Sequence, residues 1–311
     1  MTFSPKERTA LVAAAHQTIE DGSQSFAFAS RLFDWETRER VWLLYAWCRA
    51  ADDITDGQDL GHNAKAPDNS AERQARLEIL TKAALGGEGE LPVPFAALRQ
   101  VAAETRLPGD LVADHLAGFA LDAAHWRPES EADLLRYCYY VAGAVGCMMA
   151  VVMGVHPKDK DTLNRASDLG LAFQLANIAR DLVPDASLGR CYIPAEWLAG
   201  MGLSAADIVL PENRHHAAAI AARLVGLTRP YRASARIGAA SLPFRARLAV
   251  LTADAVYGAI GEKVARLGAS AWDDRVRIGR VGKLALFVRA CLSAMRTVQS
   301  IPRTGLWTRP I

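Results

Sequence analysis

Acidic and amide side chains recur one helical turn apart at two places in the chain. Asp52 and Asp56 lie in RAADDITD, and Asn177, Asp181 and Asp185 repeat the four-residue spacing in NIARDLVPD. Residues four apart share one face of a helix, so each set can present several oxygens together. Oxygen ligands without His or Cys favour hard cations, and Mg²⁺ takes a few carboxylates together with water and substrate phosphate oxygens. The two clusters therefore predict a magnesium site that binds a diphosphate.

Three arginines lie within five residues of these acids: Arg49, Arg180 and Arg190. A guanidinium can bind phosphate through two parallel hydrogen bonds. The competing interpretation is local salt bridging with the acids, which contributes little at a surface. Together with a metal, the arginines could stabilise the diphosphate that departs from an allylic diphosphate and leaves a carbocation.

A carbocation must be kept away from water, so this chemistry needs a dry lining of apolar and aromatic side chains. Aromatic residues of the expected helices could supply that lining: Phe26, Phe28, Tyr45, Phe119 and Phe173. The alternative is that they are ordinary core residues, and the sequence singles out none of them.

Helices must position both acidic clusters. The stretch VWLLYAWC precedes Asp52, and GLAFQLAN precedes Asp181, so each cluster follows an apolar helical pattern. Gly57 is expected to end the helix that carries Asp52 and Asp56, because glycine adopts the left-handed conformation that ends helices. The helix dipole is negative at that end, so carboxylates there require a cation nearby.

Helical patterns continue along the whole chain, whereas alternating strand patterns are nearly absent, which predicts an all-α protein. The first helix is expected to begin at the capping box Ser4–Glu7 and to end at Gly22. Further helices are expected at about 24–33, 36–56, 70–85, 94–105, 109–125, 130–154, 159–183, 204–229, 243–267 and 281–298.

We expect one domain over residues 1–311. The one long loop-like insert, Gly57–Asn69, follows directly on the first acidic cluster, and a boundary there would leave that cluster in a fragment too small to enclose a site. The longest apolar run, Tyr140–Val155, is shorter than the roughly 20 residues of a membrane span and is expected to be a buried helix. The N-terminus lacks a signal-peptide pattern.

The composition of the chain argues against several classes of function. The chain has 311 residues, 51% of them hydrophobic, and a formal net charge of +2, which fits a globular protein and predicts no binding of nucleic acid. Its five scattered cysteines indicate neither a disulfide framework nor a zinc site and favour the cytoplasm.

Residues 275–311 carry eight basic side chains and no acid. This segment is predicted to rest on the anionic inner face of a membrane, and the alternative is a solvated or internally paired charge set.

Segments in the expected order resemble a known family. They are GSQSF (Gly22–Phe26), LYAWCRAADDITD (Leu44–Asp56), DHLAGFALD (Asp114–Asp122), RYCYYVAGAVG (Arg136–Gly146), LGLAFQLANIARD (Leu169–Asp181) and GRCYIPAEWL (Gly189–Leu198). The chain resembles the squalene and phytoene synthases, which are head-to-head trans-isoprenyl diphosphate synthases. These segments, with the closing GLWTRP, are most similar to bacterial members that make phytoene.

This resemblance implies a single-domain, all-α isoprenoid synthase (prenyltransferase) fold around a central cavity, with two acidic motifs that face each other and bind Mg²⁺ or Mn²⁺. It implies condensation of two geranylgeranyl diphosphates through prephytoene diphosphate to phytoene in carotenoid biosynthesis, without a reductant. The alternatives are a squalene or dehydrosqualene synthase acting on farnesyl diphosphate, a terpene cyclase, and a non-catalytic scaffold of the same fold. Downstream carotenoid enzymes would then be candidate partners.

Roles for single residues also follow from the resemblance. Metal binding is implied for Asp52, Asp56, Asn177, Asp181 and Asp185. Contact with the diphosphate or substrate is implied for Tyr45, Arg49, Gln174, Arg180 and Arg190, with Ser23 and Ser25 in a flap over the diphosphate. Tyr137 matches a tyrosine held to assist ionisation or proton handling, and it joins Asp52, Asp56 and Asp181 as the expected catalytic set.

Two positions depart from the family pattern. Gln24 stands where many members carry a basic residue, so a weaker phosphate contact is expected there. Pro184 stands where an acid is common; it cannot donate a backbone hydrogen bond, and it biases Val183 away from the helix. We therefore expect Asp185 to leave the face that it would share with Asp181, and Asp185→Ala to harm activity less than Asp181→Ala.

Overall fold

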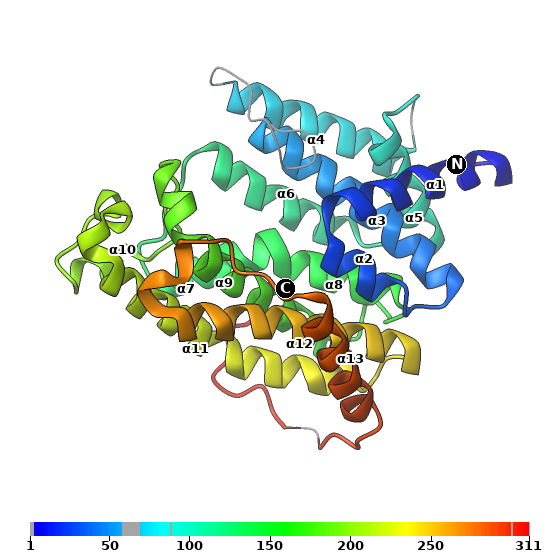
Figure 1. The fold of residues 1–311 in the computed structure, drawn as a ribbon. Helices are drawn as coiled ribbons and strands as arrows, with labels where there is room; N and C mark the ends of the chain where they lie inside the picture. The colour runs from blue at the N-terminus through cyan, green and yellow to red at the C-terminus, as the bar shows by residue number, and fades with distance from the viewer. Residues whose placement is uncertain (1–2, 58–68, 88, 300, 311) are drawn as a thin grey trace.

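A computed structural model describes residues 3–57, 69–87, 89–299 and 301–310. The side chains of Gln24, Ser25 and Asp56 lie outside the described part, as does most of the insert Gly57–Asn69. Helices dominate the described ranges, which contain no strand (Figure 1). The expected all-α fold is confirmed.

Most expected helices occur within a few residues of their predicted bounds. The α-helices are α1 (Pro5–Gly22), α2 (Gln24–Ser30), α3 (Trp35–Asp56), α4 (Ser70–Gly86), α5 (Val93–Thr105), α6 (Gly109–Ala123), α7 (Glu131–Cys138), α8 (Ala144–Val152), α9 (Lys160–Ser187), α10 (Ala195–Ala199), α11 (Arg214–Ala239), α12 (Phe244–Leu267) and α13 (Arg280–Ala294). Short π or 3₁₀ segments are η1 (Tyr139–Gly143), η2 (Ala205–Val209), η3 (Pro211–Asn213) and η4 (Gly268–Trp272).

Caps at both ends of α3 explain where the first acidic cluster lies. The Asp34 side chain accepts a hydrogen bond of 2.9 Å from the Thr37 N–H at the start of the helix. Gly57 ends it with φ 64°, as the sequence predicted. Residues 52 and 56 therefore lie in the last turns of α3, where the backbone carbonyls are negative and favour a cation.

Two expectations about helix bounds were wrong. The helix predicted at 204–229 is α11, which begins at Arg214 and continues past Pro230 to Ala239. Residues before it form η2 and η3, because Ser204 caps a 3₁₀ turn and Pro211 starts the next one. The interruption expected near Pro184 is also absent, since α9 runs through it to Ser187 with Leu182 and Val183 buried. Tertiary packing outweighs the local cost of each proline.

The helix expected at 130–154 is a rod of α7, η1 and α8. Its residues Glu131–Val152 are long and apolar enough to cross a membrane, yet 61% of the apolar window is buried inside the fold. It packs on α6 and α9, as expected for a core helix. At its crossing with α9, a Cβ added to Gly170 would lie 2.2 Å from the Ala142 carbonyl oxygen, so only glycine permits this approach.

Helix α9 occupies the middle of the fold, with α11 and α12 on one side and α6 and α8 towards the other (Figure 1). One hydrophobic cluster joins α1, α3, α4, α5, α6 and α8 around Trp47 and Phe95. A second joins α7, α9 and α11 around Leu171 and Ile220. A cavity lies between these clusters and is lined by residues from both groups of helices.

Candidate active site

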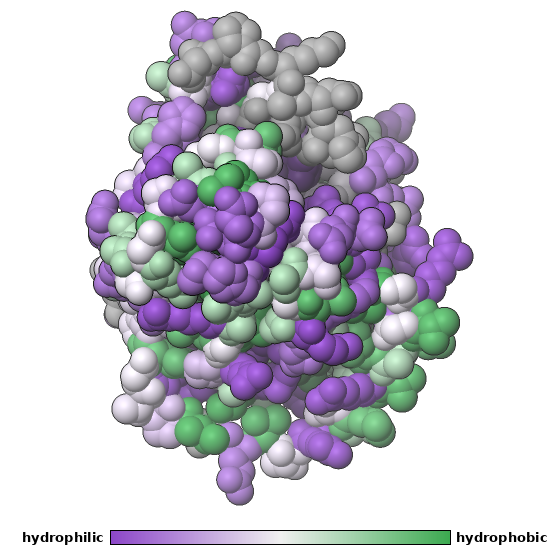
Figure 2. Space-filling view, turned by 60° about the vertical axis from the view of Figure 1, so that its left-hand side comes forward, coloured by the Kyte–Doolittle hydropathy of each residue, from purple (hydrophilic) through white to green (hydrophobic). Residues whose placement is uncertain are grey.

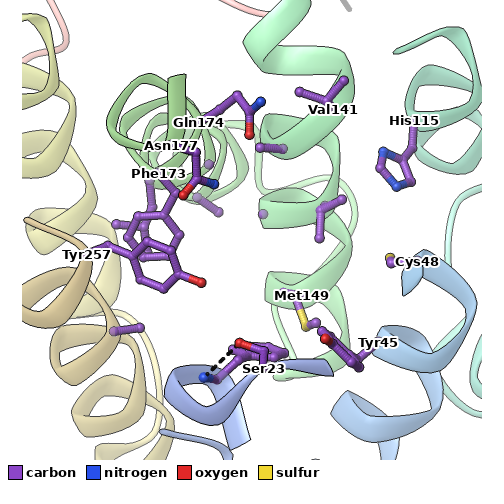
Figure 3. A pocket seen from close by; sticks show the side chains of 18 of the residues that line it. Ser23, Tyr45, Cys48, His115, Val141, Met149, Phe173, Gln174, Asn177 and Tyr257 are labelled. Carbon is purple, nitrogen blue, oxygen red and sulfur yellow. Dashed lines mark hydrogen bonds between the residues drawn. The ribbon is translucent and has the colours of Figure 1, made fainter. Parts of the chain in front are cut away.

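The cavity has a volume of about 670 Å³ and follows α9 (Figure 3). Its lining includes α9 residues from Thr162 to Asp185, a length of about 35 Å at the helical rise per residue. The lining includes carboxylates and guanidinium groups from the last turns of α3 and from the C-terminal part of α9. The remaining lining is mainly apolar, which suits a ligand with a charged head and a long hydrocarbon tail.

Every predicted site residue whose side chain is described lies on this cavity. These are Ser23, Tyr45, Arg49, Asp52, Tyr137, Gln174, Asn177, Arg180, Asp181, Asp185 and Arg190. The predicted residues Ser25 and Asp56 have side chains outside the described part. Asp185 lines the same cavity as Asp181, so the expected departure of Asp185 from the shared face does not occur.

Arginines contact the acids on both walls. The Arg49 guanidinium lies 3.1 Å from Asp52 and 2.5 Å from Asp53, all on α3. Asp53 does not line the cavity, in agreement with its place on a neighbouring helix face. The Asp52 pair is half-exposed and screened, so it contributes little to stability, and Arg49 can exchange it for a phosphate oxygen.

On α9, the Arg180 Nε donates a hydrogen bond of 2.9 Å to Asp181. Arg275, which follows η4, also lines the cavity, and its guanidinium lies 3.9 Å from Asp181. Sequence reasoning counted Arg275 only in the basic C-terminal segment. No local signal could have found it, because nearly a hundred residues separate the two in the chain.

The donor chemistry of the two walls fits Mg²⁺ or Mn²⁺ held jointly with a diphosphate. Asp52 from α3 and Asn177 and Asp181 from α9 offer only oxygen-donor side chains of the type that Mg²⁺ prefers. Among the described side chains, no three His, Cys, Asp or Glu residues are close enough to hold an ion by themselves. An ion that takes one or two carboxylates and completes its shell with phosphate oxygens and water needs no such group.

Tyr137 belongs to a hydrogen-bonded cluster that sequence reasoning did not predict. Its hydroxyl donates to Asp122 at 2.9 Å, and the Tyr192 hydroxyl donates to the same carboxylate at 3.1 Å. The two tyrosine rings are stacked with centroids 4.9 Å apart. Burial raises the pKa of Tyr137 well above its usual value, and the adjacent Asp122 charge adds to the shift. Asp122 and Tyr192 lie inside family-like segments, which was the only sequence signal for them.

The rest of the cavity wall is apolar or aromatic. Phe26, Phe119 and Phe173 line it, and Phe173 stacks on Tyr257 with ring centroids 4.2 Å apart. Both side chains of this stacked pair face the space between α9 and α12 in Figure 3. Phe28 was expected in the lining but instead packs edge to face against Phe287 of α13, with ring centroids 6.4 Å apart. These ring faces can stabilise a positive charge that develops inside the cavity.

Close packing fixes the predicted flap against α3. The Ser23 hydroxyl caps α2 by accepting a hydrogen bond of 3.3 Å from the Phe26 N–H. A Cβ added to Gly22 would lie 2.5 Å from the Tyr45 hydroxyl oxygen. Any larger residue at position 22 would therefore displace Tyr45 from the cavity wall. Ser23 and Tyr45 lie near each other at one side of the cavity (Figure 3).

Comparison with known proteins agrees with this geometry. The squalene/phytoene synthase family model matches residues 19–281. The chain is 46% identical to the 15-cis-phytoene synthase of Enterobacter agglomerans over 94% of this chain and all of that protein. It is 41% identical to the 15-cis-phytoene synthase of Paracoccus sp. over 96% of this chain and 98% of that protein.

Solved structures of related enzymes share the fold. A dehydrosqualene synthase bound to a ligand superposes with a TM-score of 0.82 at 25% identity, over 92% of this chain and 97% of that one. Squalene synthase HpnC from Alicyclobacillus acidocaldarius superposes with a TM-score of 0.74 at 22% identity, over 85% and 97%. By sequence and by fold, the chain belongs to the squalene/phytoene synthase family.

Proposed function

We propose that this chain catalyses the phytoene synthase reaction, in which two geranylgeranyl diphosphates join head to head through prephytoene diphosphate and yield phytoene. The name that its bacterial relatives carry over nearly their whole length supports this reaction over the alternatives. The observation in the fold that carries the proposal is one cavity lined by the carboxylates and arginines of both acidic motifs and by many apolar and aromatic side chains.

The chain's own residues bind the charged head of the substrate. Arg49, Arg180 and Arg190 are the proposed phosphate ligands, because guanidinium–phosphate pairs combine charge with two directed hydrogen bonds. Tyr45 and Gln174 are proposed to contact the substrate beside them, and Ser23 and Ser25 to cover the diphosphate. Mg²⁺ or Mn²⁺ would be held by Asp52, Asp56, Asn177, Asp181 and Asp185, where it would neutralise charge on the departing diphosphate.

Aromatic residues of the cavity wall exclude water and stabilise the cation. Phe26, Phe119 and Phe173 supply ring faces along the wall. Burial raises the pKa of Tyr137 further above neutral pH, and its protonated hydroxyl is a hydrogen-bond donor. In this proposal the Tyr137 hydroxyl, positioned by Asp122, turns its single hydrogen bond from that carboxylate to the diphosphate and so assists its departure.

A product assay tests the proposal directly. The purified protein is incubated with Mg²⁺ and either geranylgeranyl or farnesyl diphosphate, without a reductant, and the extracted hydrocarbons are identified by chromatography and mass spectrometry. We expect phytoene from the longer substrate, no product in excess chelator, and recovery when Mg²⁺ is added back. Turnover of farnesyl diphosphate alone would assign the chain to the squalene or dehydrosqualene synthases instead.

We also propose that the enzyme works in the cytoplasm, in peripheral contact with the inner membrane face, because its substrate and product are long apolar molecules. Contact with downstream carotenoid enzymes stays a prediction. Fractionation of cells that express the chain, followed by immunodetection, tests the location.

A further inference from the structure

Helix α13 carries a stripe of large apolar residues on its outer face. We call the set Val281, Leu284, Val288, Leu292 and Met295 the α13 stripe. These side chains are 83%, 61%, 51%, 53% and 68% exposed, respectively. At 3.6 residues per turn they fall within about a quarter of the helix circumference. A row of five exposed, adjacent apolar side chains is unusual for a surface in water and indicates an interaction site.

The opposite face of α13 is anchored in the fold. Ala290 and Ala294 are each 2% exposed and pack in a cluster with Leu251 of α12. Phe287 meets Phe28 of α2 with ring centroids 6.4 Å apart. The helix is therefore held with its apolar stripe outward. Figure 2 shows one face of the molecule, on which hydrophobic side chains lie between hydrophilic ones.

Basic residues flank the α13 stripe without a matching acid. Arg277, Arg280, Arg289 and Arg296 are exposed, and none of them forms an ion pair within the described part of the chain. Residues 275–311 contain no Asp or Glu. Other basic residues of this segment are used inside the fold; Arg303, for example, pairs with the buried Asp168. Within residues 276–296, every charged side chain is basic.

We propose that the α13 stripe inserts into the interface of an anionic lipid bilayer, while the flanking arginines bind lipid phosphates. An apolar face bordered by arginines is the pattern of helices that lie in the membrane interface. A second copy of the chain is a poorer occupant, because a two-fold contact through this surface would bring like-charged arginines together. This proposal rests on the peripheral membrane contact proposed above and gives that contact a surface, and it does not depend on the reaction.

The location of α13 gives this surface a consequence for the cavity. Helix α13 packs on α12, and α12 contacts α2. Both α2 and α12 contribute residues to the cavity lining, among them Phe26, Val250 and Ala253. Insertion of the α13 stripe would thus hold this wall of the cavity beside the bilayer, where a long apolar product is soluble.

Flotation with lipid vesicles tests the proposal in the full chain. Vesicles of phosphatidylcholine, with or without phosphatidylglycerol, are mixed with the protein at physiological salt. The stripe variant Leu284→Gln/Leu292→Gln is compared with a matched control, Ile79→Gln/Leu85→Gln, whose leucine and isoleucine are exposed on α4. We expect wild type and the α4 control to float with anionic vesicles. The stripe variant should bind these vesicles at least about tenfold more weakly, because two leucines no longer enter the acyl boundary.

A charge variant separates the two parts of the surface. Arg289→Gln/Arg296→Gln should bind anionic vesicles about fivefold more weakly for each arginine removed and should leave weak binding to neutral vesicles unchanged. Equal thermal unfolding midpoints and equal product formation in detergent would establish that all variants are folded. The proposal is overturned if wild type does not bind anionic vesicles, if the stripe and α4 variants lose binding equally, or if wild type is a dimer that the stripe variant converts to monomer.

Discussion

At the scale of single residues, Asp122 is the carboxylate on which two tyrosines of the cavity converge. It accepts hydrogen bonds from Tyr137 and from Tyr192, and Tyr137 is only 3% exposed. Both donors lie on the cavity lining, as does Asp122 itself. The pair of donors therefore orients the Tyr137 hydroxyl at the cavity wall.

Removing one hydroxyl at a time tests this assignment. Tyr137→Phe is expected to lower kcat by about 100-fold, within the range of a positioned proton donor or acceptor. It should destabilise the fold by only about 1 kcal/mol, because Asp122 keeps its bond from Tyr192. Steady-state kinetics and urea unfolding measure the two effects. Tyr192→Phe is the matched control, and an equal loss of kcat in both variants would show that the two hydroxyls act only through Asp122.

Asp181→Ala is still expected to lose more activity than Asp185→Ala, but for a different reason than the one predicted from the sequence. Asp185 stays on the cavity wall, so its replacement should also lower activity. We still expect Asp181→Ala to lower kcat more than Asp185→Ala, because it also releases Arg180 and the nearby Arg275 from their shared carboxylate. Single-turnover rates at saturating Mg²⁺ compare the two variants, and equal loss would contradict the order.

At the scale of elements, the rod α7–η1–α8 and α9 approach so closely that glycine is required at their crossing. The added Cβ at Gly170 would meet the Ala142 carbonyl oxygen at 2.2 Å, and at Gly146 it would meet the Ala166 carbonyl oxygen at 2.4 Å. Both glycines also line the cavity. The π-helical segment η1 lies within this crossing, as such segments often do near functional sites.

Alanine at this crossing should destabilise the fold. Gly170→Ala is expected to lower the free energy of unfolding by about 1–3 kcal/mol, because backbone atoms of α9 and η1 must separate. The matched control is Gly226→Ala in α11, where no atom lies within 4 Å of the added Cβ. That variant should gain about 0.5–1 kcal/mol from reduced chain entropy. Opposite signs in urea unfolding are the expected result, and a loss in both variants would contradict it.

Three N-terminal helices meet at Glu104 of α5. Its carboxylate binds Arg8 of α1 at 2.6 Å and Arg40 of α3 at 2.9 Å, and Gln100 donates to it at 2.7 Å. Burial opposes ionisation of Glu104, but these hydrogen bonds outweigh it and lower its pKa to about 2. The helix that carries Asp52 is thereby tied to its neighbours.

This shift predicts a pH dependence of stability. The folded pKa of Glu104 lies below its ordinary value of 4.5, so the carboxylate contributes stability above that pH and loses it as the pH falls towards about 2. Glu104→Gln should therefore be less stable than wild type at pH 7, with a difference that shrinks below about pH 4.5. Thermal unfolding of both proteins from pH 7 to pH 3 measures it, and a constant difference would contradict the assignment.

At the scale of the whole molecule, the C-terminal segment 301–310 is hydrogen-bonded to the N-terminal half of α9. Arg303 binds the buried Asp168 through two hydrogen bonds, 2.8 and 2.6 Å long. Arg165 of α9 donates to the Ile301 carbonyl at 2.9 Å, and Arg309 donates to Asn164 at 3.0 Å. These contacts join the last residues of the chain to the helix that carries most of the site.

Loss of the Arg303 pair should be costly, because it leaves a buried charge. Arg303→Ala is expected to lower the free energy of unfolding by about 3 kcal/mol, since Asp168 is 1% exposed. Adding Asp168→Asn should restore part of that loss by removing the unpaired charge. Urea unfolding at pH 7 of both single variants and the double variant measures the coupling. Simple additivity would contradict it.

Local interactions made much of this protein predictable from its sequence. Caps such as Ser4 and Gly57, the apolar period of the helices and the four-residue spacing of Asp52 and Asp56 act within a few residues, so helices and acidic clusters could be read directly. The path of α9 through Pro184 could not be read in this way, because it depends on buried neighbours in other helices.

Contacts between distant residues were decided only by the tertiary structure. Arg275 reaches Asp181, and Tyr192 shares Asp122 with Tyr137, across stretches of chain that no periodicity connects. The sequence by itself determined the helices and the chemical types at their ends, because short-range sterics and hydrogen bonds act on neighbours. The tertiary structure decided which of those ends share a cavity, because burying complementary surfaces against each other is stabilising however far apart they lie in the chain.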